Sequence, residues 1–248
     1  MRMSGEVATS PAPAVVLVEP SLPENVGAVA RVIGNFGGGE LRLVNPCDHL
    51  SSTALSLATH SAKVLREARI FATLNDALAD RQFVIGTSAR KRERHARPLP
   101  LPQVGTLLPD SGTRLAVVFG RESSGLTNEE LALCHACVHV PTQGPASSLN
   151  LSHAVGVVLY EMTRNPPVGA TPAASALATT RQVNGLKTHL FEVLDAVGFL
   201  KPGAEASIRQ SFADLMGRAR PTDLDVRLLR GFLHRVQVTL RRAGRLES

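Results

Sequence analysis

Short apolar runs rich in β-branched residues recur along the first two thirds of the chain. They have the length and composition of buried strands and lie at 14–19, 41–45, 68–72, 82–87, 114–120 and 137–141. The segments between them have apolar residues at helical spacing, as at Asn25–Phe36, Leu74–Asp80 and Thr127–Leu133. Strands that alternate with helices predict an α/β fold with a parallel sheet, in which ligands bind beyond the carboxyl ends of the strands.

The last apolar segment of this region begins with an unusual loop. In "PTQGPASSLNLSHAVGVVLYEM", Pro141–Met162, the second half predicts a buried helix whose apolar face is Leu151, Val155, Val158, Leu159 and Met162. The first half holds Ser147, Ser148 and Asn150 around Leu149. One or two polar residues are enough to cap a helix. The third indicates that some of these groups face something else.

The character of the chain changes after residue 164. Residues 165–180 contain three prolines, one glycine and no charge, which is typical of a linker. The segments 181–198, 204–218 and 222–243 predict three helices, the last with Thr222 as its N-cap. Its stripe of Leu224, Leu228, Phe232, Val236 and Leu240 we interpret as ordinary helical core. We therefore expect a disordered tail (1–13), an α/β domain (14–164), a linker (165–180) and a basic helical domain (181–248).

Composition narrows the class of protein. The chain has 248 residues, 44% of them hydrophobic, which is enough to bury a substantial core. Its apolar runs are far shorter than the ~20 residues of a membrane helix, and its first residues lack the apolar region of a signal peptide. Three cysteines do not suggest a disulfide framework. These features predict a cytoplasmic protein.

Positive charge gathers in two places. The net charge is +6, and residues 181–248 contribute +5 of it, with 12 Lys and Arg against 7 Asp and Glu. A second cluster, "RKRERHAR", spans Arg90–Arg97. Either cluster alone is more often solvated surface. Together they favour a polyanionic partner.

Two strand ends lead into loops with candidate chemistry. In "EPSLPENVGAVAR", Asn25 and Arg31 lie six residues apart, so on a helix they point within about 120° of each other. Gly27 between them allows a backbone or ligand to come close. An N-cap and a surface arginine would explain the same residues. In "VVFGRESSGLTNEEL", Gly120 and Glu122 follow a strand directly.

Several alternative motifs fail on particular residues. A phosphate loop needs Lys after its second glycine, where this chain has Leu126, and Thr127 with Glu130 predicts a structural capping box. "GTSAR" misses a nucleophile elbow because it lacks the second glycine, whose place is taken by Arg90. The single C-x-x-C at 134–137 lacks a second pair at metal spacing, so buried thiols are the better interpretation than zinc.

Taken together, the loops resemble the signature motifs of a known family. "NVGAVAR", "FGRESSGL" and "SSLNLSHAVGVVLYE" resemble those of the SPOUT superfamily, in its branch of RNA ribose 2′-O-methyltransferases. "LRLVNP", "GTSAR" and "GLTNEELALCH" bring the likeness closer to TrmJ-type tRNA methyltransferases, which modify position 32 of the anticodon loop. "LMGRARPTDLDVRLLRGFL" is similar to the helical extension of that type.

The resemblance implies a fold, a cofactor and partners. The implied fold is an α/β sheet with a C-terminal trefoil knot that holds S-adenosylmethionine. The implied assembly is a homodimer with active sites at the subunit interface, and the implied substrate is tRNA, gripped by the basic clusters. No metal is implied. The positions that would face the cofactor are Thr87, Ser88, Ala89, Gly120, Val140, Ser147, Ser148 and Leu149.

The same resemblance assigns the catalytic positions. Arg31 would act on the ribose 2′-hydroxyl, with Asn25 and Glu122 orienting it and the RNA, and Ser148 and Asn150 organising the site. The alternatives are the same chemistry on another tRNA position or on ribosomal RNA, a non-catalytic RNA-binding protein with this fold, and a small-molecule methyltransferase.

Overall fold

The computed structural model describes residues 12–37, 39–89, 98–109, 112–143, 148–164, 176–201 and 203–242. Within these residues the chain forms a parallel seven-stranded sheet of order β3-β2-β1-β6-β4-β7-β5. The strands are β1 (Ala14–Val18), β2 (Leu41–Val44), β3 (Arg69–Phe71), β4 (Phe83–Thr87), β5 (Leu99–Pro100), β6 (Leu115–Phe119) and β7 (Ala136–His139). The predicted α/β fold with a parallel sheet is confirmed.

Both faces of the sheet are buried, because the central strands are apolar at every position. In β1, Val15 and Leu17 point to one face and Val16 and Val18 to the other, all at most 2% exposed. The first face is covered by α1 (Pro23–Asn35), α2 (Ser52–Ala58), α3 (Ala62–Arg66) and α6 (Leu151–Arg164), with the short 3-10 turns η1 (Thr59–Ser61) and η2 (Leu101–Thr106). The second face is covered by α4 (Leu74–Leu78) and α5 (Asn128–Ala132).

Helix α1 packs closely against α2 and against the turn η1 at two glycines. A Cβ atom at Gly27 would lie 2.3 Å from the carbonyl oxygen of Ala54, and one at Gly34 would lie 2.1 Å from the Ser61 hydroxyl. Close approach of a backbone at Gly27 was expected from the sequence, and the neighbour is α2. This contact fixes the first turn of α1 beside the end of β1, where Asn25 is located.

The three predicted C-terminal helices are present as α7 (Thr180–Ala196), α8 (Glu205–Ala219) and α9 (Asp223–Arg242). They share a small core that includes Leu186 of α7 and both Val226 and Leu233 of α9. The interpretation of the α9 stripe as core is wrong at three positions, because Leu224, Leu228 and Phe232 are 62%, 72% and 65% exposed. The core of this helix instead uses residues seven positions apart on its other side.

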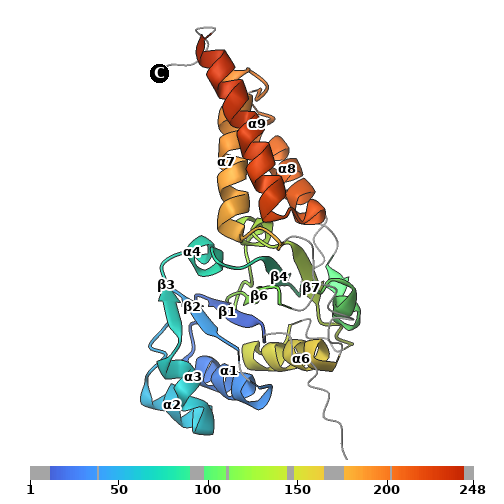
Figure 1. The fold of residues 1–248 in the computed structure, drawn as a ribbon. Coiled ribbons are helices and arrows are strands. Elements are labelled where there is room, and N and C mark those ends of the chain that lie inside the picture. The colour runs from blue at the N-terminus through green and yellow to red at the C-terminus, as the bar shows by residue number, and fades with distance from the viewer. Residues whose placement is uncertain are drawn as a thin grey trace, which may run out of the picture.

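These helices dock on the edge of the sheet where the strands begin. The Thr180 backbone N–H donates to the carbonyl of Arg81 at 2.7 Å, and Gln82 Nε2 donates to the carbonyl of Leu177 at 2.7 Å. The Arg220 guanidinium lies over the Phe83 ring at 4.6 Å. Figure 1 shows the bundle extending from the sheet near β4, β7 and α4, with α1 and α6 on the far side. None of the helices in the described ranges is long and apolar enough to cross a membrane.

Candidate functional site

A pocket of about 490 Å³ lies at the carboxyl ends of the central strands. It is formed by the loops that follow β1, β4, β6 and β7, together with the residues before α6. The structure therefore brings together segments more than a hundred residues apart. The expected cofactor-facing positions that line it are Thr87, Ser88, Ala89, Gly120, Val140, Ser148 and Leu149. Ser147 lies outside the described residues.

The loop after β6 owes its shape to two glycines. A Cβ atom at Gly120 would lie 2.2 Å from the backbone carbon of Gly125, so only glycine allows the loop to fold back so tightly. Gly125 has a φ of +69°, a conformation that other residues rarely adopt. The turn is closed by the Gly125 N–H, which donates to the carbonyl of Arg121 at 2.8 Å.

Arg121 anchors this loop rather than facing the pocket as a free cation. Its guanidinium donates to Glu19 at the end of β1 at 2.8 Å and to Glu130 in α5 at 3.0 Å. The hydrogen bonds that Arg121 donates to both carboxylates raise the pKa of its guanidinium further. Glu130 also completes the predicted capping box with Thr127, which is confirmed. One carboxylate thus joins the cap of α5 to the loop after β6.

A chain of hydrogen bonds crosses the pocket wall through Asn25. Asn25 Nδ2 donates to Glu122 Oε1 at 3.0 Å, and Asn25 Oδ1 accepts from Asn150 Nδ2 at 2.9 Å. Asn150 Oδ1 in turn accepts from the backbone N–H of Ser152 at 2.9 Å. The other oxygen of Glu122 accepts from the backbone N–H and the hydroxyl of Ser21. The loops after β1 and β6 and the start of α6 are therefore joined by side chains.

The electrostatics of Glu122 follow from these contacts. Burial disfavours its charged form, but the hydrogen bonds from Asn25 and Ser21 outweigh burial and lower its pKa. The carboxylate is therefore ionised at neutral pH and acts as an acceptor. This charge requires Asn25 to present its amide nitrogen to Glu122, which leaves the amide oxygen for Asn150.

The residues just before α6 cap this helix or line the pocket. Asn150 is the residue that caps the helix, because its side-chain oxygen accepts from the N–H of the second helical residue. Ser148 and Leu149 line the pocket. At the end of β4 the Thr87 hydroxyl donates to the carbonyl of Val118 at 2.9 Å, and the Ser88 N–H donates to that of Val138 at 3.0 Å.

Arg31 is placed apart from the other predicted catalytic positions. It lies on the exposed side of α1, whereas Asn25 is 7% exposed and faces the pocket. The pocket lining does not include Arg31. On the neighbouring helix α6, Val157 and Tyr160 are 40% and 55% exposed. The Tyr160 ring meets Phe36 of α1 at 6.4 Å between centroids.

Some lining residues were not foreseen from the sequence. Ser21 binds Glu122, and Leu22 and Thr142 line the pocket. Ser21 and Leu22 lie between the two prolines after β1, so their position beyond a strand end was a usable signal. Thr142 follows β7 in the same way. The partnership of Ser21 with a residue 101 positions away had no sequence signal.

The cysteine pair shows no metal-site geometry. Within the described ranges no group of three His, Cys, Asp or Glu side chains could hold a metal ion. Burial raises the pKa of the Cys134 thiol, which disfavours the thiolate that zinc requires. Cys134 and Cys137 both pack against the core on the second face of the sheet.

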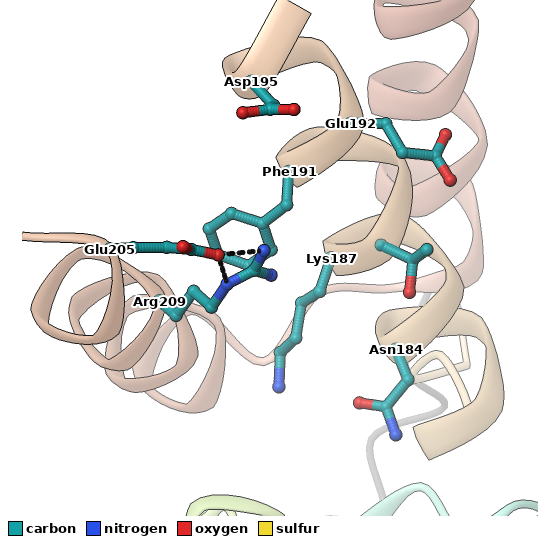
Figure 2. Close-up of a pocket in the computed structure, with 8 residues that line it drawn as sticks. Asn184, Lys187, Phe191, Glu192, Asp195, Glu205 and Arg209 are labelled. Carbon is teal, nitrogen blue, oxygen red and sulfur yellow. Dashed lines mark hydrogen bonds and ion pairs between the residues drawn. The ribbon is translucent and has the colours of Figure 1, made fainter. Parts of the chain in front are cut away.

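A second hollow, of about 600 Å³, lies between α7 and α8 (Figure 2). Lys187 points into it, and burial lowers the pKa of this lysine. Arg209 is already occupied, since it pairs with Glu205 and lies over the Phe191 ring at 4.3 Å. Because Glu192 and Asp195 also line the hollow, carboxylates outnumber cations there. This composition does not suit a polyanion.

A parallel α/β fold with a pocket at the carboxyl ends of its strands is typical of enzymes that bind a small ligand there. Sequence comparison identifies the family. Residues 12–160 match the model of the SpoU rRNA methylase family. This match covers more than half of the chain, which therefore belongs to that family. Residues 181–246 match a second model, the C-terminal domain of the tRNA methyltransferase TrmJ.

Individual relatives are similar over nearly the whole chain. The tRNA (cytidine/uridine-2′-O-)-methyltransferase TrmJ of Citrobacter koseri is 35% identical over 236 residues, covering 90% of this chain and 95% of the relative. The crystal structure of TrmJ from Z. mobilis ZM4 is 32% identical, with a TM-score of 0.78, and covers 91% of this chain and 99% of that one. An AdoMet-bound rRNA methyltransferase from Sinorhizobium meliloti is 23% identical over 63% of this chain and 57% of its own, with a TM-score of 0.52, and shares the fold.

Proposed function

We propose that this protein transfers a methyl group from S-adenosylmethionine to a ribose 2′-hydroxyl of tRNA, at nucleotide 32 of the anticodon loop. The observation that carries the proposal is the pocket at the strand ends, whose wall is held by the Glu122–Asn25–Asn150 hydrogen bonds. Relatives named as tRNA (cytidine/uridine-2′-O-)-methyltransferases, similar over 90% of the chain, support the reaction type and the substrate. The choice of nucleotide rests on the resemblance of the motifs.

The residues of the pocket suit this cofactor. Its volume of about 490 Å³ is in the range of small-molecule sites. Its lining combines apolar side chains such as Val140 and Leu149 with hydroxyls and strand-end backbone groups. That mixture fits a ligand that carries an adenine ring at one end and an amino-acid group at the other. When bound, the sulfonium of S-adenosylmethionine supplies the methyl group.

The protein's own contribution is alignment and electrostatics. Glu122, held ionised, and Asn150 keep the Asn25 amide in one orientation at the mouth of the site. Arg31 is protonated and offers donors without an acceptor lone pair. It therefore stabilises negative charge that develops on the ribose oxygen rather than acting as a base.

The exposed position of Arg31 supports a homodimer in which each subunit completes the other's site. Arg31 does not line the pocket of its own chain. The surface of α1 and α6 around it carries Val157 and Tyr160, apolar side chains that are exposed in the single chain. A second copy packed on this surface buries them and brings Arg31 to the partner's pocket. We also propose that this chain forms the C-terminal trefoil knot that the family resemblance implies.

The basic face of α9 is the proposed grip on tRNA. Arg230 and Arg241 are exposed and point to the same side of this helix. Arginines on one surface bind phosphates in a manner that weakens with salt. The other candidate cluster, Arg90–Arg97, lies outside the described residues.

The test is methyl transfer from labelled S-adenosylmethionine to unmodified tRNA, followed by mapping of the modified nucleotide. Label on the ribose of nucleotide 32 is the expected result. Label elsewhere in tRNA, or only in ribosomal RNA, would keep the chemistry and refute the target. Cofactor binding without transfer to any RNA would favour a non-catalytic RNA-binding protein, and transfer that needs no RNA would favour a small-molecule methyltransferase.

A further inference from the structure

Helix α9 presents three different faces around its axis. At 100° per residue, with Leu224 set at 0°, the core residues Val226 and Leu233 point to about 200° and 180°. Arg230 and Arg241 point to about 240° and 260°. The apolar stripe points away from the core, at about 0°, 40° and 80°, and consists of Leu224, Leu228 and Phe232.

The outward apolar face is large and open. Its three side chains are between 62% and 72% exposed, and they follow one another at intervals of one helical turn. A Cβ atom added at the adjacent Gly231 would meet no atom within 4 Å. Soluble monomers seldom expose contiguous apolar surface of this kind unless it binds something. The face therefore needs an occupant.

We propose that the outward face of α9 pairs with the same face of a second copy of this chain, with the two helices antiparallel. The charges that flank the apolar pair Leu228 and Phe232 support this arrangement. Asp225 precedes the pair by three residues and Arg235 follows it by three, and both point within about 20° of the face. When Leu228 lies opposite the partner's Phe232, each Asp225 meets the partner's Arg235.

The charge pattern selects the direction of pairing. In a parallel pair, Asp225 would face the partner's Asp225 and Arg235 the partner's Arg235, and like charges in contact are destabilising. In the antiparallel pair both contacts are attractive, and the two-fold symmetry repeats each of them. The two copies of Leu228 and Phe232 then form one apolar cluster between the helices.

The occupant is better matched by protein than by RNA. Two of the three side chains, Leu224 and Leu228, offer neither charge to phosphates nor a planar surface to bases, which leaves Phe232 as the single ring of the face. The cationic groups Arg230 and Arg241 that suit RNA lie on a separate side of the helix, which stays free in the paired state. A contact of a few helical turns is below the ~1,200 Å² of a stable interface. We therefore expect pairing at high protein concentration.

The pairing is tested by a distance measured between two nitroxide labels in the full-length protein. Arg241→Cys, in a background with Cys47→Ser, Cys134→Ala and Cys137→Ala, places one label per chain off the pairing face. Antiparallel helices centred near residue 230 separate the labels by about 35 Å, whereas parallel helices bring them within about 20 Å. The expected result is a population near 35 Å. A parallel distance, or no dipolar coupling at high protein concentration, would overturn the proposal.

Two sets of variants test whether the 35 Å distance between the labels arises from pairing through the outward face of α9. Leu228→Ser with Phe232→Ser should abolish the 35 Å population, while the matched change Arg230→Ser, on another side of α9, should preserve it. Arg235→Glu should weaken pairing at least about threefold, and Asp225→Lys in the same chain should restore it. Persistence of the distance in the double serine variant would assign it to another contact and refute the proposal.

The experiment is independent of the proposed function. Loss of methyl transfer with the distance intact leaves the pairing standing, and loss of the distance leaves the reaction standing. If the double serine variant loses tRNA affinity while the free protein shows no paired population, the face is an RNA contact and the proposal fails.

Discussion

The amide of Asn25 and the carboxylate of Glu122 form the central contact of the pocket wall, with 3.0 Å between Nδ2 and Oε1. The two residues are 97 positions apart and come from the loops that follow β1 and β6. The charge on Glu122 orients the amide, and the amide in turn helps to keep Glu122 charged. The orientation of the Asn25 amide and the charge of Glu122 therefore depend on each other.

Replacing this donor by an acceptor should weaken the fold in a pH-dependent way. Asn25→Asp places a second carboxylate against Glu122, so one of the two must take up a proton or remain unpaired. We expect the free energy of unfolding at pH 7 to fall by about 1–3 kcal/mol, and by less at pH 5, where protonation relieves the repulsion. Urea unfolding at both pH values measures this. Asn35→Asp, on the exposed end of α1, is the control, and equal losses at the two positions would contradict the prediction.

Mixed dimers distinguish an arginine that acts in its own pocket from one that acts across an interface. Arg31→Ala alone should leave stability unchanged, because the side chain is exposed, and should abolish transfer. Gly120→Val should spoil the pocket, since its Cβ would overlap the Gly125 backbone. Subunits of the two inactive variants, mixed equally, should regain roughly a quarter of wild-type activity, because half of the dimers then contain one complete site. No recovery after subunit exchange would place Arg31 in its own pocket or outside the mechanism.

The buried side chain of Arg42, near the start of β2, should dominate the change in folding stability at acid pH. The Arg42 side chain is 0% exposed and pairs with Asp80 at 2.5 Å and Glu40 at 2.8 Å. For Asp80 these hydrogen bonds outweigh burial and hold its pKa well below its usual range. Because the carboxylate's pKa is depressed in the folded state, its contribution is present above pH ~4 and is lost as the pH falls further.

Removing that arginine should therefore cost much more than removing a surface charge. We expect Arg42→Met to lower the free energy of unfolding at pH 7 by about 3 kcal/mol, at the low end for a broken buried pair because Arg81 still binds both carboxylates. It should also flatten the decline below pH 4. Lys63→Met, which breaks an exposed pair with Glu67, should change stability by less than about 0.5 kcal/mol. Equal effects in chemical unfolding would refute the assignment.

His135 should make stability fall as the pH drops below neutral. Its ring accepts from the Val84 N–H at 3.1 Å, and burial, with Lys187 and Arg220 nearby, lowers its pKa to about 4. The unfolded chain binds a proton below pH ~6.5 that the folded chain refuses, so stability is lost between pH 6.5 and 4. The loss is at most about 3 kcal/mol. His135→Asn keeps the acceptor without the titration, and unfolding at pH 7.5, 5.5 and 4.5 should show a flatter profile for the variant.

Charge reversal on the basic face of α9 should weaken tRNA binding without changing cofactor binding. Arg230→Glu and Arg241→Glu each remove a candidate phosphate contact, so the slope of log K against log salt should decrease by about 1 per site. Filter binding at several salt concentrations measures the slope. Glu192→Gln, in the acidic hollow between α7 and α8, is the control. An unchanged slope would exclude this face from the RNA interface.

The sheet could be predicted from the sequence because its central strands are apolar on both faces. Each of the six apolar runs overlaps a strand of the structure, while β5 has only the two residues Leu99 and Pro100, too few to form a pattern. Helix α2 was missed because its buried residues are the alanines Ala54 and Ala58, whose spacing carries little signal. Helix α3 was missed because it has five residues and buries Leu65 alone, which is too little to form a pattern. Helix α9 carries two sets of apolar residues at helical spacing. The longer set contains the exposed residues Leu224, Leu228 and Phe232, and the shorter set contains the buried residues Val226 and Leu233.

The site could be predicted as a set of loops but not as a set of contacts. Strand ends and glycines pointed to the loops, and the family resemblance pointed to Thr87, Gly120 and Ser148 within or beside them, which do line one pocket. That Asn25 bridges Glu122 and Asn150 depends on distances between segments that only the fold brings together. The exposure of Arg31 also depends on how α1 rotates against the sheet, which the spacing from Asn25 leaves open.

The hydrogen-bonded wall of the pocket cannot serve as a proton wire. Asparagine amides do not release or take up protons near neutral pH, so Asn25 and Asn150 interrupt any relay. Glu122 is a weak base because its pKa is lowered by the same bonds. A proton that leaves a hydroxyl bound here must therefore pass to bulk water at the pocket mouth. Turnover should then follow the access of solvent to that mouth, and should not depend on a general base in the wall.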